Sequence, residues 1–297
     1  MSKNKVLVID GNNMLYRAYY KFENLQNNHG QLTGVIYGFP YILRGLISLH
    51  KPQKVVVVFD GGRDKRRTEI LPEYKKRDKK AGFDGESFFF QKEKVKELLD
   101  LLGIPMIEVK KREADDIIWL IARKLKREKH EVVIVSSDKD FNQLICKGIS
   151  IWNPKSDKRY THLNLKQEVG YNANQCVDYL ILDGDSSDNI KGMPGIGPKK
   201  AMAFLDRGIS IRNYLISKDK ELPGLSRNKL EPVFLLNREL IDIRIFCRRN
   251  LKHLKVKVPK VTLKKINKKE LAYFCANYDI STFVKPDFIE TFNKLLK

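Results

Sequence analysis

Nine acidic side chains recur at positions where a metal ion could be held. They are Asp10, Asp60, Glu113, Asp115, Asp116, Asp138, Asp140, Asp185 and Asp188. Asp10 and Asp60 each directly follow a short apolar run, and Asp138 follows a third run after two serines. Carboxylate oxygens are the ligands that hard divalent cations such as Mg²⁺ and Mn²⁺ prefer. No histidine stands within these motifs, which argues against zinc and against histidine acid–base catalysis.

Such a set of carboxylates indicates hydrolysis of a phosphodiester. Two divalent cations about 4 Å apart can activate a water molecule and stabilise the leaving oxygen. Taken singly, the acids have structural explanations. Asp115 and Asp116 could stabilise the first turn of a helix by about 0.3–1 kcal/mol, and Asp185 and Asp188 could belong to a solvated loop. Their recurrence at strand ends carries the prediction of a metal site.

Alternating strands and helices are expected to position these acids. Apolar runs rich in valine and isoleucine predict buried parallel strands at residues 6–9, 55–59 and 132–135. Helical patterns are found at residues 33–50, 88–102 and 114–129. The alternation predicts an α/β fold with a central, mostly parallel sheet flanked by helices. Because ligands bind beyond the carboxyl ends of such strands, we expect the acids to gather at one edge of the sheet.

The strand signal fades after about residue 175, where short helices with Gly/Pro turns take over. We therefore place a boundary near residue 170. Residues 1–170 are expected to form an α/β metal-binding domain, and residues 171–297 a helical domain with a basic surface.

The composition points to a polyanionic partner. The chain carries 57 Lys and Arg against 36 Asp and Glu, a net charge of +21. Abundant charges of both signs together with 42% hydrophobic residues fit a folded protein whose field attracts nucleic acid. A generally lysine-rich proteome is the alternative. The four cysteines form no C-x-x-C pair, no apolar run approaches the ~20 residues of a membrane span, and no signal peptide is evident. We expect a soluble protein of the cytoplasm.

The basic segment at residues 72–80 follows shortly after Asp60. Tyr74 could stack on a base, and Lys75 and Arg77 could contact a phosphate. A solvated charged loop is the alternative. The three phenylalanines at residues 88–90 could form a stacking wedge, but core packing of the following helix is favoured.

A glycine hairpin at residues 192–201 is the sharpest phosphate-binding pattern. Gly195 and Gly197 permit a close backbone approach, and Lys199 and Lys200 stand at the start of the expected helix. We expect this hairpin to grip the backbone of duplex DNA without reading its sequence. An ordinary tight turn is the alternative. A Walker loop is excluded because its order of residues is absent.

Five motifs occur in an order that resembles the 5′ nuclease family, which comprises the N-terminal domain of bacterial DNA polymerase I, stand-alone phage 5′ exonucleases and flap endonucleases. The motifs are residues 8–13, 58–61, 113–116, 136–140 and 184–197. The resemblance covers about residues 6–205, and the last ninety or so residues match only loosely.

The resemblance implies a PIN-like nuclease core with two metal ions, Mg²⁺ or Mn²⁺. Three sets of ligands would hold them: a first group of Asp10, Asp60, Glu113, Asp115 and Asp116, bridging acids Asp138 and Asp140, and a second group of Asp185 and Asp188. It also implies a helical arch at about residues 75–100, in which Lys75 contacts the scissile phosphate and Arg77 is a second cation. The glycine hairpin resembles a helix–three-turn–helix element, which is often associated with K⁺.

The expected function is cleavage of DNA at 5′ flaps and 5′ ends by two-metal-ion catalysis, and the sequence leaves open whether RNA in RNA–DNA hybrids is also cleaved. A non-catalytic protein that binds branched DNA and a PIN-type ribonuclease are the alternatives. We expect a monomer acting in a bacterial or phage-infected cytoplasm, and the stand-alone form favours a phage protein. The sequence identifies no protein partner.

Overall fold

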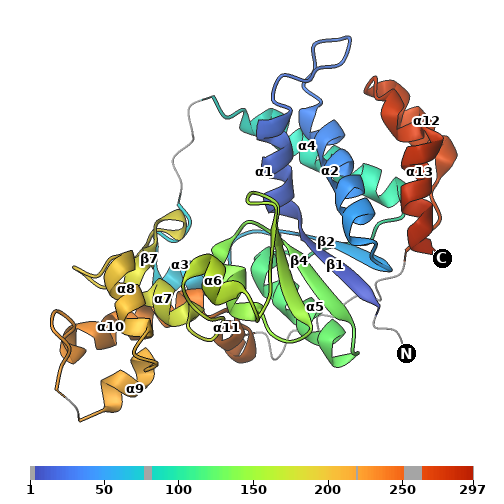
Figure 1. The fold of residues 1–297 in the computed structure, drawn as a ribbon. Coiled ribbons are helices and arrows are strands. Elements are labelled where there is room, and N and C mark those ends of the chain that lie inside the picture. The colour runs from blue at the N-terminus through green and yellow to red at the C-terminus, as the bar shows by residue number, and fades with distance from the viewer. Residues whose placement is uncertain (1–3, 77–81, 219, 251–262, 297) are drawn as a thin grey trace. The chain divides into compact units, whose positions relative to one another are not determined.

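The computed structural model describes residues 4–76, 82–218, 220–250 and 263–296 (Figure 1). Contacts divide the chain into two compact units that do not follow chain order. The first unit comprises Met1–Gly61, Lys79–Ser137 and Lys257–Lys297, and the second comprises Gly62–Asp78 and Asp138–Val256. Each unit is described by itself.

Four parallel strands form the centre of the first unit, in the order β3-β2-β1-β4. Their bounds are β1 Lys5–Asp10, β2 Lys54–Phe59, β3 Met106–Glu108 and β4 Glu131–Val135. In β1, Val8 pairs with Val56 of β2 and with Ile134 of β4. These strands are almost wholly apolar because helices cover both of their faces. The predicted parallel sheet and α/β class are confirmed.

Helices pack on the two faces of this sheet (Figure 1). They are α1 Gly11–Lys21, α2 Gly34–His50, α4 Gly85–Leu101, α5 Ala114–Arg127, α12 Lys268–Asn277 and α13 Pro286–Asn293, with short 3₁₀ turns η3 Ser281–Val284 and η4 Lys294–Leu296. α5 packs on β1, β2 and β4, whereas α1, α2 and α4 form a layer on the opposite face, against which α12 and α13 pack. In α4, Phe88 is buried, as core packing predicts, but Phe89 and Phe90 are exposed.

The second unit is mainly helical. Its helices are α3 Lys65–Ile70, α6 Leu165–Val169, α7 Cys176–Asp183, α8 Pro198–Leu205, α9 Ile211–Ile216, α10 Arg227–Ile241 and α11 Ile243–Asn250, with 3₁₀ turns η1 Lys139–Leu144 and η2 Ser186–Asp188. Two antiparallel ribbons complete it: β5 Ile149–Asn153 with β6 Lys158–Tyr160, and β7 Gly184–Asp185 with β8 Ile190–Lys191. Its core includes Leu180, Leu205, Tyr214 and Leu230.

The compact units group the chain differently from the sequence-based domains. The segment with α12 and α13 joins the first unit because these helices pack on α4 and α2. The boundary near residue 170 stays a prediction. None of the described helices combines the length and apolar character that crossing a bilayer requires.

Candidate metal centres

The first acidic group lies in the first unit, at the carboxyl end of the sheet. Asp10 ends β1 and Asp60 follows β2, its parallel neighbour, so the topology places both at one edge. Asp60 Oδ1 accepts a hydrogen bond from the backbone N–H of Ala114, 2.6 Å away, which ties it to the start of α5. Asp115 and Asp116 occupy the first turn of that helix.

Burial and neighbouring charge act strongly on Asp10. The side chain is 7% exposed, and this burial, followed by the charge of Asp115, raises the pKa of Asp10 well above its ordinary value, with Asp60 adding to the effect. Asp10 Oδ1 caps α1 by accepting from the N–H of Asn13, 3.0 Å away. Its Oδ2 accepts from the Ser136 hydroxyl at 2.8 Å. A buried carboxylate with acidic neighbours is a position where a cation would relieve repulsion.

The remaining members of the first group are also enclosed. Glu113 is the N-cap residue of α5 and is 3% exposed, and Asp116 is fully buried. The charges of Asp60 and Asp115 therefore both act on Asp10. Glu113 and Asp116 stand at the start of the same helix as Asp115.

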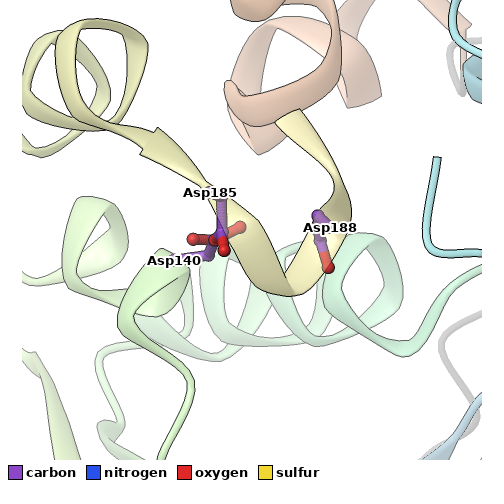
Figure 2. A group of neighbouring side chains, drawn as sticks. All are labelled: Asp140, Asp185 and Asp188. Atoms are coloured by element: carbon purple, nitrogen blue, oxygen red, sulfur yellow. The ribbon is translucent and has the colours of Figure 1, made fainter. Parts of the chain in front are cut away.

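The second acidic group lies in the second unit and is the tighter of the two. Asp140, Asp185 and Asp188, hereafter the acidic trio, are all buried, and one carboxylate oxygen from each lies within 4.8 Å of the others (Figure 2). Asp140 comes from η1, Asp185 from the end of β7 and Asp188 from η2. An all-oxygen, buried and negatively charged donor set fits a hard divalent cation.

Hydrogen bonds and lysines fix the acidic trio and its neighbour Asp138. Asp185 Oδ1 accepts from the backbone N–H and the hydroxyl of Ser187, at 2.9 and 2.6 Å. Lys139 Nζ lies 3.5 Å from Asp185 Oδ2. Asp138 caps η1, with its Oδ1 accepting from the N–H of Asp140 at 2.9 Å. Sequence reasoning missed Lys139, although a lysine between two aspartates was a readable signal.

Two glycines let the loop of the acidic trio form. A Cβ on Gly184 would lie 2.5 Å from the backbone nitrogen of Gly192, and a Cβ on Gly192 would lie 2.4 Å from the backbone of Asp183. Gly184 also has a φ of +87°. The short β7–β8 ribbon that presents Asp185 therefore requires glycine at both places.

Lys75, at the start of the predicted arch, lies beside the acidic trio. Lys75 Nζ is 3.6 Å from Asp188 Oδ2. Tyr74, by contrast, is 2% exposed and belongs to the hydrophobic core of the second unit. Its ring has no open face for a base, so the stacking role predicted for Tyr74 is corrected to that of an anchor. Arg77 and the arch residues 77–81 lie outside the described residues.

The glycine hairpin leads into α8 as expected. Gly195 has a φ of +77°, and Gly197 is the N-cap residue, with Pro198 at the first helical position. Lys199 and Lys200 are both exposed. Lys200 Nζ donates to the carbonyl of Gly195 at 2.8 Å, so part of its hydrogen-bonding capacity is used within the hairpin.

Gly61, which follows Asp60, is packed against the backbone of another loop. A Cβ there would lie 2.1 Å from the carbonyl oxygen of Val109. We expect Gly61→Ala to destabilise the protein by at least about 2 kcal/mol, because backbone must move. The matched control is Gly45→Ala in α2, where a Cβ meets nothing within 4 Å. It should be neutral or stabilise by up to about 1 kcal/mol. Urea unfolding measures both, and equal stability of the two variants would contradict the close approach.

Comparison with known proteins agrees with this architecture. Residues 5–170 match the model of the 5′-3′ exonuclease N-terminal resolvase-like domain, and residues 171–271 match that of the 5′-3′ exonuclease C-terminal SAM fold. A 5′-3′ exonuclease of Aquifex aeolicus is 34% identical over 272 residues, which are 88% of this chain and 93% of that protein. DNA polymerase I of Bacillus subtilis is 33% identical over 249 residues, 81% of this chain but 28% of that protein.

A solved structure of T5 5′-exonuclease with bound divalent metal ions (zinc) shares the fold, with a TM-score of 0.70 at 19% identity and 98% of each chain covered. The two family models together account for 5–271, including every acid of both groups. The chain belongs to the 5′-3′ exonuclease family.

Proposed function

We propose that this protein is a structure-specific nuclease that hydrolyses phosphodiester bonds at 5′ flaps and 5′ ends of DNA. One observation carries the proposal: the buried acidic trio lies beside the ammonium group of Lys75, 3.6 Å from Asp188. Phosphodiester cleavage needs positive charge on the phosphate oxygens and ligands for a catalytic cation. The acidic trio supplies such ligands, and Lys75 supplies a cation for the scissile phosphate.

The acids are proposed to hold two ions of Mg²⁺ or Mn²⁺. Asp10, Asp60, Glu113, Asp115 and Asp116 would form one ligand set, and the acidic trio with Asp138 the other. Divalent cations supply charge stabilisation of phosphoryl oxygens and favour ionisation of a bound water. The buried carboxylates of the chain would hold such ions, and the absence of histidine from both groups fits hard cations better than zinc.

The remaining roles concern DNA. The glycine hairpin, with Gly195, Gly197, Lys199 and Lys200, is proposed to bind the backbone of duplex DNA, with K⁺ as its monovalent ion. Residues 75–100, with Lys75 and Arg77, are proposed to form the arch around a 5′ single strand. RNA in RNA–DNA hybrids is proposed as an alternative substrate, and the protein is proposed to act as a monomer in a bacterial or phage-infected cytoplasm.

Cleavage of labelled flap substrates tests the proposal. A 5′-labelled flap duplex in Mg²⁺ should yield a product cut near the junction, whereas EDTA should stop cleavage and a 3′ flap should be a poor substrate. Absence of cleavage in both Mg²⁺ and Mn²⁺ would reject the proposal. Retention of the flap duplex without cleavage would indicate a branched-DNA-binding protein, and cleavage restricted to RNA would indicate a ribonuclease.

The hairpin lysines should differ in their effect on DNA binding. Affinity for duplex DNA is expected to fall steeply with salt. The logarithm of the association constant should fall with the logarithm of the salt concentration, with a slope of about −0.9 for each neutralised phosphate. Lys199→Ala should reduce this slope by about 1, and Lys200→Ala by less, because Lys200 already donates to Gly195. Lys155→Ala, in the exposed β5–β6 turn, is the control. Fluorescence anisotropy at about 50 to 200 mM salt measures the slopes. Identical slopes for all variants would contradict hairpin binding.

A further inference from the structure

The turn that carries Lys75 is tied to the loop of the acidic trio by one asparagine. Asn189 Nδ2 donates to the backbone carbonyl of Glu73 at 2.9 Å and to that of Lys76 at 2.5 Å. These carbonyls flank Tyr74 and Lys75 on either side. A single carboxamide, from a residue more than a hundred positions later in the chain, therefore holds both ends of the turn.

The backbone of Lys75 itself is held at both of its polar groups. Its N–H donates to the carbonyl of Asp188 at 3.1 Å. Its carbonyl accepts from Nη2 of Arg63 at 2.7 Å. Lys75 has a φ of 51°, a left-handed conformation that is uncommon for a residue with a side chain. Such a conformation persists where the surroundings determine it, and here the hydrogen bonds with Asp188 and Arg63 do so.

The chemistry of asparagine suits position 189. Asn189 also has a left-handed backbone, with a φ of 58°, which asparagine tolerates better than most residues. Its amide nitrogen carries two N–H groups, one for each carbonyl of the turn. Glycine would satisfy the backbone without supplying the donors. Aspartate would tolerate the backbone but would present acceptors to two carbonyl oxygens.

We propose that Asn189 is a positioning residue for Lys75: it fixes the Lys75 turn against the acidic trio so that one phosphate can meet both. The inference rests on the proposed role of Lys75 in cleavage and adds to it the group that sets where the lysine stands. The buried ring of Tyr74 anchors the middle of the same turn. Asn189 acts through Lys75 rather than on the substrate.

Asn189→Gly is the first test variant, because it keeps the left-handed backbone and removes both donors. We expect the single-turnover rate of flap cleavage to fall at least about tenfold, while DNA binding measured in EDTA changes by less than about twofold. Asp157→Gly, at another left-handed residue in the β5–β6 turn, is the matched control and should cleave like the wild type. If Asn189→Gly does not fold, Asn189→Asp serves in the same measurements.

A double-mutant cycle with Lys75→Ala separates positioning from general stabilisation. Once Lys75 is gone, Asn189→Gly should slow cleavage no further, since its effect passes through the lysine. An equal loss in both backgrounds, or a wild-type rate for Asn189→Gly, would overturn the proposal. Amide hydrogen exchange gives a readout besides activity: exchange at Lys75 should speed up in Asn189→Gly but not in Asp157→Gly. If Lys75→Ala alone cleaves normally, the proposed function of Lys75 fails. Faster exchange at Lys75 in Asn189→Gly would still show, separately, that Asn189 holds the Lys75 turn.

Discussion

Asp10→Asn is expected to lower the rate of flap cleavage at least about 100-fold and, in EDTA, to raise the melting temperature. The loss of rate follows from removing a charged ligand, since a catalytic cation contributes several kcal/mol and each ~1.4 kcal/mol is a factor of ten. The gain in stability has a different origin. Burial and then the charge of Asp115 raise the pKa of Asp10 in the folded protein.

The sign of the stability effect follows from proton linkage. Because the pKa of Asp10 is raised in the folded state, the folded protein binds more protons than the unfolded chain between the two pKa values. Stability therefore falls as the pH rises from the unfolded pKa through the folded one. At neutral pH without metal, the buried and ionisable carboxyl group of Asp10 therefore lowers the free energy of unfolding, and asparagine, which cannot ionise, removes this cost. Asparagine also keeps an oxygen for the N–H of Asn13 and can bond to the Ser136 hydroxyl.

Thermal unfolding in EDTA and in Mn²⁺, together with single-turnover cleavage, measures both effects of Asp10→Asn. Asp279→Asn is the control, because Asp279 is an exposed acid of the first unit that accepts from the N–H of Asn28. It should change neither quantity. A melting temperature that falls in EDTA along with the loss of cleavage would mean that the Asp10 carboxylate stabilises the fold and that the loss of rate follows from unfolding.

The sheet was predictable where burial on both faces leaves a continuous apolar run. The predicted strands at residues 6–9, 55–59 and 132–135 lie within β1, β2 and β4. Among the elements of the first unit that were not predicted are α1 and β3. α1 opens with glycine and two asparagines, which are poor helix formers, and it depends on the cap from Asp10 and on burial of its apolar face. β3 has only three residues and pairs along β2.

The candidate site was predictable in its residue types but not in its surroundings. A tyrosine followed by lysines suggests stacking on a base, yet Tyr74 is buried by core residues that come over a hundred positions later, such as Leu180 and Leu205. The same distance in sequence separates Asn189 from the turn that it holds. Local pattern identifies a carboxylate or an amide, whereas its partners depend on packing between remote segments.

The acidic trio leads to the second large effect. Asp185→Asn is expected to slow flap cleavage at least about 100-fold and to reduce the stabilisation by Mn²⁺, while flap binding in EDTA changes by less than about threefold. The carboxylate is 3% exposed and lies within 4.8 Å of two other carboxylates, so a cation there would offset mutual repulsion. Asparagine retains an oxygen for the N–H and hydroxyl of Ser187, which preserves the local turn.

Asp185→Asn also breaks the ion pair between Asp185 and Lys139, so its control must break an ion pair elsewhere. Glu168→Gln breaks the ion pair with Lys158, 2.7 Å long, outside the acidic trio and should leave cleavage unchanged. Cleavage at the wild-type rate by Asp185→Asn would confine the catalytic cations to the first acidic group. If the stabilisation by Mn²⁺ were at the same time smaller in Asp185→Asn than in the wild type, the trio would hold a structural ion. Loss of cleavage with unchanged stabilisation by Mn²⁺ would instead mean that Asp185 acts through its ion pair with Lys139 rather than by holding the ion.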